Sequence, residues 1–389
     1  MRQWSQEKMK SRATKLPESG GGGGGSEDDE LMFEVGLKPH AGGEYSHAVV
    51  QANSVIEDQS QVVVSPAATF VGVYDGHGGP EASKFVLKHL VAHVNKFGTE
   101  ARGLSTQVIR KAFNATEEGF ERLVKQSVSS RPQLATVGTC CLFGAILRDG
   151  LYIANVGDSR AVLGQRGRDG SVVAVRLSTD HSVGNEKVRK EVEALNPDDK
   201  QIVKFCHGVW RIKGILTVSR AIGDLFLKKP GIGNYPVLLK RPAISAEPSI
   251  LVRRIQPQDL FLIFASDGLW DQLSDEGAVN IVSRSPRAGV AKRLVKAALV
   301  EAARKRMMSY SRLQEVARGP RRQIHDDISV VVLYLDQHSS SSNKVISGSR
   351  HDTSSSRSAA TPIGISSSNT SSRSDQSGID PVRRETRKS

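Results

Sequence analysis

Short apolar runs alternate with turn-forming residues over most of the chain. Runs of strand length occupy residues 68–74, 139–147, 151–156, 161–164, 172–177, 260–266 and 328–335. Many are almost continuously apolar, which is typical of strands covered on both faces. The turn Arg148-Asp149-Gly150 separates 142–147 from 151–156, and this spacing predicts an antiparallel hairpin.

Helical periodicity appears between groups of these strands. It predicts helices over 80–94, 105–125 and 288–307, with Pro80 in a first turn and Ser105 as an N-cap. The helices do not alternate strictly with the strands. This order favours sheets stacked on each other with helices outside them, over a doubly wound parallel sheet.

The two ends differ in composition from the middle. Residues 1–38 contain a basic start, a glycine run over 20–25 and an acidic stretch over 27–30, whereas 337–389 is rich in Ser and Arg. Such segments bury too little apolar area to fold alone. We therefore predict a disordered N-terminal segment with a glycine linker (1–38), one globular domain (39–336) and a disordered tail (337–389).

Composition narrows the function classes. Hydrophobic residues make up 38% of the chain, and no apolar run reaches the ~20 residues of a membrane span. Three cysteines cannot form a disulfide framework, so we expect an intracellular protein.

The net charge is +13, with a basic stretch from Arg284 to Arg322. This stretch is either a solvated helix face or a surface for phosphoproteins, anionic lipid or nucleic acid, but no base-reading motif accompanies it.

Carboxylates recur at the ends of the apolar runs. They are Glu57, Asp58, Asp75, Asp158, Asp267, Asp326 and Asp327. Each alone is compatible with a turn or a helix cap, but together they predict strand ends that meet around cations. Oxygen ligands select Mg²⁺ or Mn²⁺ over zinc, and two such ions side by side suit the hydrolysis of a phosphate ester.

The motifs that hold these acids occur in a characteristic order. They are ED at 57–58, DGHGG at 75–79, GDSR at 157–160, SRAIGD at 219–224, SDGLWD at 266–271 and HDDISV at 325–330. In this order they resemble the PPM/PP2C metal-dependent serine/threonine protein phosphatases. Residues 49–54 and 211–214 are most similar to the plant group called clade D, whose members act in plant signalling.

The resemblance implies a four-layer α-β-β-α sandwich of two antiparallel sheets flanked by helices. It implies two Mn²⁺ or Mg²⁺ ions per subunit and attack by a metal-bridging hydroxide on phosphoserine or phosphothreonine. Asp75 would bridge both ions. The Gly76 carbonyl and Glu57 would complete one of them, and Asp267 and Asp326 the other.

Further roles are implied around that centre. Asp58 would orient bound water, and Asp158 with Asp271 would line a third, weaker metal position. His77 would be the general acid that protonates the leaving oxygen. Asp327 would take a position where the family usually has Asn.

One position departs from the family pattern. Many members have an arginine four residues before the Glu, and it binds the substrate phosphate, but here that residue is Asn53. Arg211 and Lys213 could supply the cation or be ordinary surface charges, so the group that binds the phosphate stays unassigned.

The alternative function is a pseudophosphatase or regulatory binding module of the same fold. Otherwise we expect a monomer that acts on phosphoproteins in cytoplasm or nucleus, with peripheral membrane association left open.

Overall fold

The apolar runs assemble into two antiparallel six-stranded sheets. The computed structural model describes residues 12–14, 31–148, 150–229, 231–232 and 239–336. The first sheet consists, in spatial order, of β1 (Arg12–Thr14), β4 (Gln59–Val64), β5 (Ala68–Tyr74), β8 (Cys141–Leu147), β9 (Leu151–Val156) and β15 (Ser249–Arg253). The second consists of β11 (Val172–Arg176), β10 (Arg160–Arg166), β16 (Asp259–Ala265), β17 (Ile328–Tyr334), β3 (Gly43–Val50) and β2 (Met32–His40).

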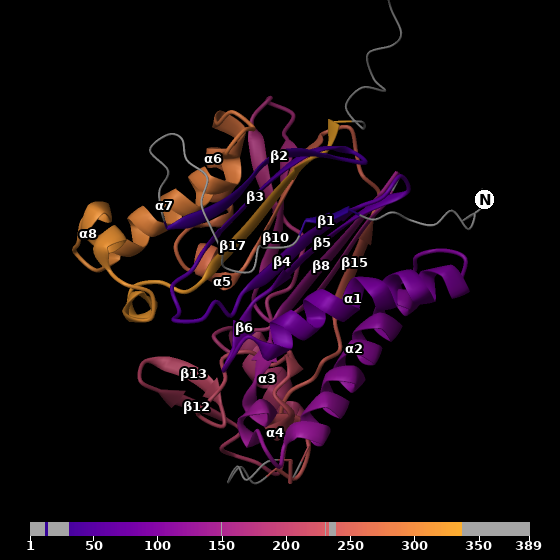
Figure 1. Ribbon diagram of the computed structural model, residues 1–389, viewed down its shortest axis with the longest axis vertical. Coiled ribbons are helices and arrows are strands. Elements are labelled where there is room, and N and C mark those ends of the chain that lie inside the picture. The colour runs from indigo at the N-terminus through magenta and orange to yellow at the C-terminus, as the bar shows by residue number, and fades with distance from the viewer. Residues whose placement is uncertain (1–11, 15–30, 149, 230, 233–238, 337–389) are drawn as a thin grey trace, which may run out of the picture. The chain divides into compact units, whose positions relative to one another are not determined.

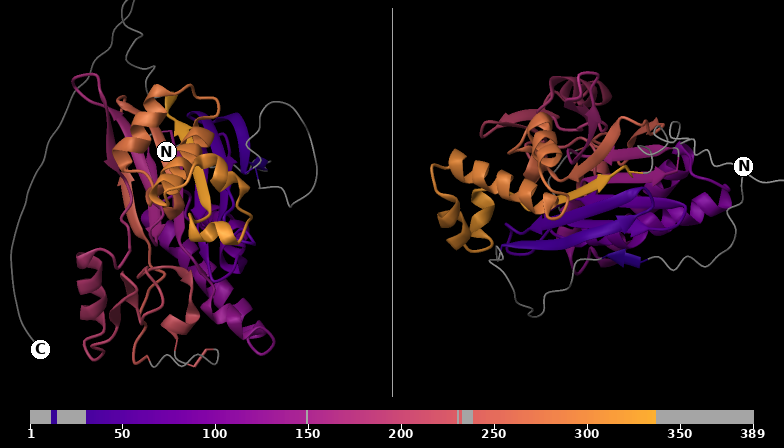
Figure 2. Two further views of the ribbon diagram at one scale, coloured as in Figure 1. Left: turned by 90° about the vertical axis from the view of Figure 1, so that its left-hand side faces the viewer. Right: turned by 90° about the horizontal axis from the view of Figure 1, so that it is seen from above.

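Helices cover the outer face of each sheet. Helices α1 (Glu81–Glu100) and α2 (Thr106–Ser127) pack on the first sheet, whereas α6 (Asp275–Arg284) and α7 (Val290–Lys305) pack on the second. The two helix pairs lie on opposite sides of the sheets (Figure 1, Figure 2). The predicted four-layer α-β-β-α sandwich is therefore confirmed.

Strand β5 shows why its apolar run has no polar face. Val71 and Val73 point between the sheets and pack with Phe264 of β16. Phe70 and Tyr74 point to the other face and pack with Val86 and its neighbours on α1. Both faces of β5 are therefore buried, and the strand that leads into Asp75 is held rigidly.

The predicted hairpin and helix start are present. Strands β8 and β9 pair antiparallel, with Ile146 opposite Leu151. The Ser105 side chain caps α2 by accepting a hydrogen bond from the Val108 amide at 3.2 Å. Side-chain capping supplies an acceptor for one of the free amides of a helix start, and the sequence pattern identified it.

The predicted N-terminal domain boundary is wrong. Strand β2 covers Met32–His40 and pairs with β3, so the folded domain begins before residue 39. Four of its nine residues are apolar, but Val35 alone among these four is buried, which suits a strand at the edge of a sheet. The predicted tail, 337–389, lies outside the described residues.

A small lobe connects β11 to β15. The sequence pattern did not predict its helices and strands. It contains α3 (Glu186–Leu195), the hairpin of β12 (Val203–Cys206) and β13 (Val209–Ile212), β14 (Ile222–Gly223) and α4 (Leu225–Lys228). These elements lie together at one end of the two sheets (Figure 1). The remaining short elements are β6 (Gly76–His77), β7 (Gly138–Thr139), η1 (Pro132–Thr136), α5 (Asp267–Trp270), α8 (Tyr310–Glu315) and η2 (Pro320–Gln323).

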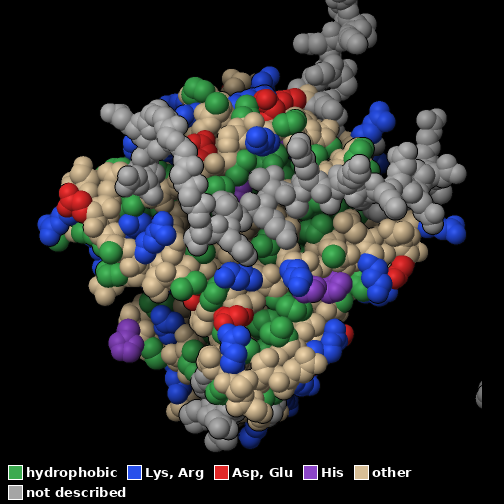
Figure 3. Space-filling view, in the orientation of Figure 1, with side chains coloured by type: hydrophobic (Ala, Val, Ile, Leu, Met, Phe, Trp, Pro, Cys, Tyr) green, Lys and Arg blue, Asp and Glu red, His purple; other side chains and the backbone are tan. Residues whose placement is uncertain are grey.

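The helices and the charged surface can be compared with the membrane-binding and nucleic-acid-binding alternatives. No helix within the described ranges has the length and apolar character needed to cross a bilayer. On the face drawn in Figure 3, lysine and arginine side chains are scattered among acidic and apolar ones instead of gathering in one patch.

Candidate active site

The site is built at the point where β5 ends. Asp75 follows this buried strand and is itself only 8% exposed. Its carbonyl oxygen accepts hydrogen bonds from the Cys140 amide at 2.8 Å and the Thr139 hydroxyl at 2.9 Å. These bonds fix the backbone around Asp75, so that its carboxylate has a defined position between the two sheets.

Glu57 and Gly76 come together beside Asp75. A Cβ atom added to Gly76 would lie 2.4 Å from the Glu57 carbonyl oxygen, so only glycine fits there. That carbonyl oxygen also accepts a hydrogen bond from the Ser83 hydroxyl on α1, at 2.5 Å. The first turn of α1 therefore holds the Glu57 backbone against the Asp75 turn.

The end of β16 brings Asp267 to the same place. The Asp267 amide lies 3.4 Å from Asp75 Oδ2. Asp267 Oδ1 is buried and has no hydrogen-bond partner within the described part of the chain. Asp58 is 1% exposed, and its Oδ2 accepts a hydrogen bond from the Ser266 hydroxyl at 2.7 Å. A buried carboxylate oxygen without a donor is the kind of atom that a cation would satisfy.

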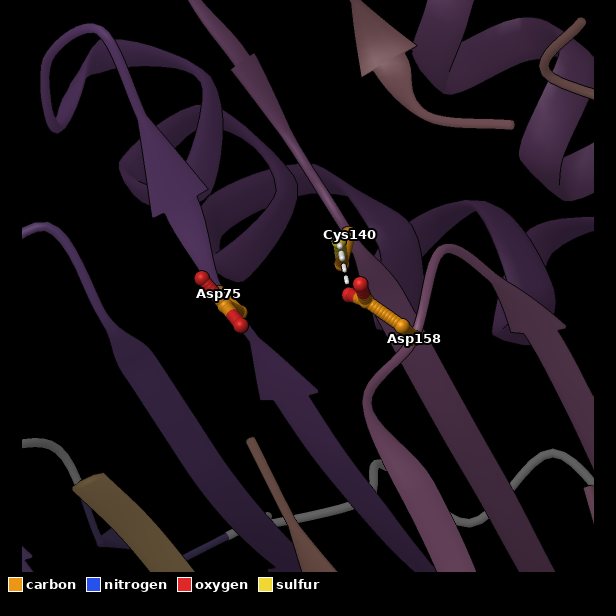
Figure 4. A group of neighbouring side chains, drawn as sticks. All are labelled: Asp75, Cys140 and Asp158. Atoms are coloured by element: carbon orange, nitrogen blue, oxygen red, sulfur yellow. Dashed lines mark hydrogen bonds between the residues drawn. The ribbon is translucent and has the colours of Figure 1, made fainter. Parts of the chain in front are cut away.

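Asp158 approaches from the end of β9, across from Asp75 (Figure 4). Ligand atoms of Asp75, Cys140 and Asp158 all lie within 4.8 Å of one another. Burial raises the pKa of the Cys140 thiol well above its usual range, and its Sγ donates to Asp158 Oδ1 at 3.3 Å. Cys140 therefore orients Asp158 as a hydrogen-bond donor and is not a thiolate ligand of the kind that would favour zinc.

The structure separates the two adjacent aspartates before β17. Asp326 lies at the cavity, where Asn53 Nδ2 is 3.4 Å from its Oδ1 and Arg322 pairs with its Oδ2 at 2.6 Å. Asp327 is 2% exposed and accepts hydrogen bonds from the amides of residues 52, 53 and 57 at 2.7, 3.0 and 2.8 Å. Asp327 therefore holds the loop that carries Glu57, and its oxygens are already used.

His77 has a partner that the sequence did not single out. Its Nε2 lies 2.8 Å from Oδ2 of Asp224, which is 1% exposed. Burial opposes a charge on the ring, but the Asp224 carboxylate outweighs it and raises the pKa of His77 above its ordinary value. Asp224 belongs to the SRAIGD motif, and the position of an acid in this motif was the only signal that could have found it.

One cavity of about 610 Å³ collects these groups. Its walls include Glu57, Asp75, Gly76, His77, Asp158, Arg211, Asp224, Asp267, Asp271, Arg322 and Asp326. Asp58 stands behind this wall, buried against Ser266. Every residue predicted as a metal ligand or general acid is therefore brought to the same place, whereas Lys213 does not line the cavity and pairs with Asp199 instead.

Known proteins resemble this chain in sequence and in fold. Residues 39–308 match the family model described as protein phosphatase 2C. The chain is 61% identical over 326 residues to "Probable protein phosphatase 2C 63" of Arabidopsis thaliana, covering 80% of this chain and 86% of the relative. It is 59% identical over 317 residues to "Probable protein phosphatase 2C 78" of Oryza sativa subsp. japonica, covering 79% and 81%.

The chain belongs to the protein phosphatase 2C family. It is a metal-dependent serine/threonine protein phosphatase that acts on phosphoproteins. The fold also resembles the crystal structure of serine-threonine phosphatase 2C from Toxoplasma gondii, with a TM-score of 0.58 at 19% identity, covering 78% of this chain and 98% of that one.

The electrostatics of the phosphatase site explain why it needs cations. Burial raises the pKa values of Asp58, Asp75 and Asp267 well above the usual range, and repulsion from neighbouring acids adds to the rise. Burial and the nearby Asp271 raise the pKa of Asp158 to about 6. Divalent cations would offset this repulsion and keep the carboxylates ionised.

Proposed function

We propose that the phosphatase holds two Mn²⁺ or Mg²⁺ ions between the ends of β5 and β16 and the starts of β4 and β17. The observation that carries this proposal is the convergence of Glu57, Asp75, Asp267 and Asp326 on one cavity. The buried, partnerless Oδ1 of Asp267 supports it, as do the raised pKa values of the acids. Bound there, the ions would lower the pKa of a water molecule and offset the charge of the phosphate.

Individual roles follow from position. Asp75 would contact both ions, with the Gly76 carbonyl and Glu57 completing one ion and Asp267 and Asp326 completing the other. Asp58, held by Ser266 behind the cavity wall, would accept a hydrogen bond from metal-bound water. A third, weaker ion would lie near Asp158 and Asp271, both of which line the cavity.

His77 would serve as the general acid. Water adds to phosphorus, the bond to the seryl or threonyl oxygen breaks, and that oxygen takes a proton from the imidazolium. Asp224 binds Nε2 and supports the charged ring, which leaves the Nδ1 proton for the leaving oxygen. The products are inorganic phosphate and the free hydroxyl, with no covalent enzyme intermediate.

The test is the substitution Asp75→Asn in the full chain, assayed with a phosphothreonine peptide and Mn²⁺. The neutral amide suits a site where burial already disfavours the charge, so the thermal stability of the metal-free protein should be retained. Turnover should fall below detection, and full activity should require added Mn²⁺ or Mg²⁺. Asp198→Asn, at an exposed side chain, is the matched control and should keep normal turnover. Unchanged turnover in Asp75→Asn, or full activity in EDTA, would contradict the proposed site.

A second assay, with p-nitrophenyl phosphate and Mn²⁺, addresses the pseudophosphatase alternative. A binding module without turnover would bind Mn²⁺ but leave p-nitrophenyl phosphate intact. The complete set of carboxylates at the cavity favours an active enzyme.

We further propose that the phosphatase belongs to the clade D subgroup and works as a monomer inside the cell. The plant relatives and residues 49–54 and 211–214 support the subgroup. The free thiols of Cys140, Cys141 and Cys206 suit a reducing compartment. Sedimentation equilibrium of the full chain and imaging of a fluorescent fusion would test the monomer and the cytoplasmic or nuclear location.

A further inference from the structure

The substrate brings a phosphate dianion to a cavity lined by many carboxylates, so a fixed cation at the wall would favour its binding alongside the metal ions. Asn53 supplies no charge there. The Lys and Arg residues that line the cavity, within the described ranges, are Arg211 and Arg322. These two side chains are therefore the candidates, and their surroundings differ.

Arg211 is already engaged in its own turn. It lies on β13, and its Nη1 donates to the Ile215 carbonyl oxygen at 2.7 Å. This bond ties the guanidinium to the β13 turn, next to apolar wall residues such as Val209 and Leu216. We therefore expect Arg211 to form part of the cavity wall and not to reach the carboxylates.

Arg322 lies on the side of the cavity where Asn53 is found. The Asn53 amide and the Arg322 guanidinium contact the two oxygens of one carboxylate, that of Asp326, at 3.4 and 2.6 Å. Arg322 and Asn53 therefore share Asp326 as a common partner. Although burial raises the pKa values of Glu57, Asp271 and Asp326, the Arg322 charge opposes the rise in all three, so the guanidinium lies within electrostatic reach of both halves of the site.

The backbone around Arg322 is anchored to the Asn53 loop. The Gly319 amide donates to the Ala52 carbonyl oxygen at 2.7 Å. The buried Arg321 donates from Nη1 to the Gln51 carbonyl oxygen at 3.0 Å. The start of η2 is therefore anchored to residues 51–52 by two hydrogen bonds, while the Arg322 side chain remains 52% exposed at the cavity. The rigid base and the exposed fork are what a phosphate-binding arginine requires.

We propose that Arg322, which lies in η2, binds the phosphate of the substrate. It supplies the positive charge that Asn53 lacks. One terminal nitrogen contacts Asp326, and the remaining N–H donors of the guanidinium can bind two phosphate oxygens. This inference rests on the proposed metal site, because the phosphate would lie between Arg322 and the ions.

The test uses the full chain with Mn²⁺ and compares wild type with Arg322→Ala, Arg322→Lys and Arg318→Ala. Arg318 is an exposed arginine two residues before η2 that does not line the cavity, so Arg318→Ala controls for the loss of one positive charge. Binding of inorganic phosphate is measured by calorimetry, and KM and kcat are measured with a phosphothreonine peptide. Mn²⁺ binding is measured separately, without phosphate.

Arg322→Ala should weaken phosphate binding and raise KM by about tenfold, the loss expected for one charged hydrogen-bond donor. Arg322→Lys should lie between wild type and Ala, Arg318→Ala should match wild type, and Mn²⁺ affinity should not fall in any variant. Unchanged phosphate affinity in Arg322→Ala would overturn the proposal. A matching loss of Mn²⁺ affinity would also overturn it, because Arg322 would then only position Asp326. Failure of the wild type to bind Mn²⁺ or to turn over would instead count against the metal site itself.

Discussion

Asp326 and Asp327 are adjacent acids with opposite surroundings, and exchanging each for asparagine should have opposite effects. Asp327 accepts hydrogen bonds from three backbone amides, whereas Asp326 faces the cavity. In Asp327→Asn one carboxylate oxygen becomes an NH₂ group that faces a backbone N–H donor. The variant therefore loses at least one buried hydrogen bond and weakens the others.

The magnitude follows from those contacts. A buried donor left without an acceptor costs about 1–3 kcal/mol, and the two remaining hydrogen bonds lose the roughly twofold strength that the charge gives them. A total of about 2–3 kcal/mol corresponds to a fall in Tm of about 3–5 °C for a domain of this size. In Asp326→Asn, by contrast, one charge leaves a crowded group of acids in which burial raises the pKa of Asp326. The Tm of this variant without metal should stay the same or rise.

The assay is thermal unfolding in EDTA and again with Mn²⁺. Saturating Mn²⁺ should stabilise the wild type by about 2.7 kcal/mol at one hundred times the dissociation constant. Asp326→Asn should lose most of this increment, whereas Asp327→Asn should begin from a lower Tm and keep part of it. If Asp327→Asn unfolds within ~2 °C of wild type in EDTA and loses the Mn²⁺ increment, then the assigned roles are exchanged and the reasoning is wrong.

Other substitutions test the proton donor and a buried histidine. His77→Gln should lower kcat for a phosphothreonine peptide by roughly 10²-fold or more but change p-nitrophenyl phosphate hydrolysis little, because nitrophenolate leaves without a proton; equal losses would argue against a general acid. Gly138→Ala should give the same selective loss, because the new Cβ would lie 2.1 Å from Asp224 Oδ2 and 2.5 Å from His77 Nε2, and normal peptide turnover would show that the pair is dispensable. Burial lowers the pKa of His47 to about 4, so its contribution to stability is complete above the unfolded pKa of about 6.5 and is lost as the pH falls toward 4. Between pH 7 and 5 the wild type should lose about 2 kcal/mol more unfolding free energy in urea than His47→Asn, and equal losses would mean that His47 is not buried in its neutral form.

Much of the fold could be predicted from local pattern. The run over 68–74 matches β5, and β8 and β9 form the expected antiparallel pair. These strands are buried on both faces, so their apolar character appears directly in the sequence. The edge strand β2 and the β12–β13 hairpin were not identified from the sequence, because few of their positions are fully buried.

The identity of the candidate ligands also came from the sequence, because a carboxylate at the end of a buried strand is costly unless a cation or a hydrogen-bond donor neutralises it. What the tertiary structure decided is the use of each group. Asp327 turns to the backbone of residues 52–57, and Asp224 reaches His77 from a distant motif. Arg322 comes to the cavity because Arg321 and Gly319 anchor η2 to residues 51–52. Such directions depend on hydrogen bonds between segments far apart in the chain, and local sequence cannot specify them.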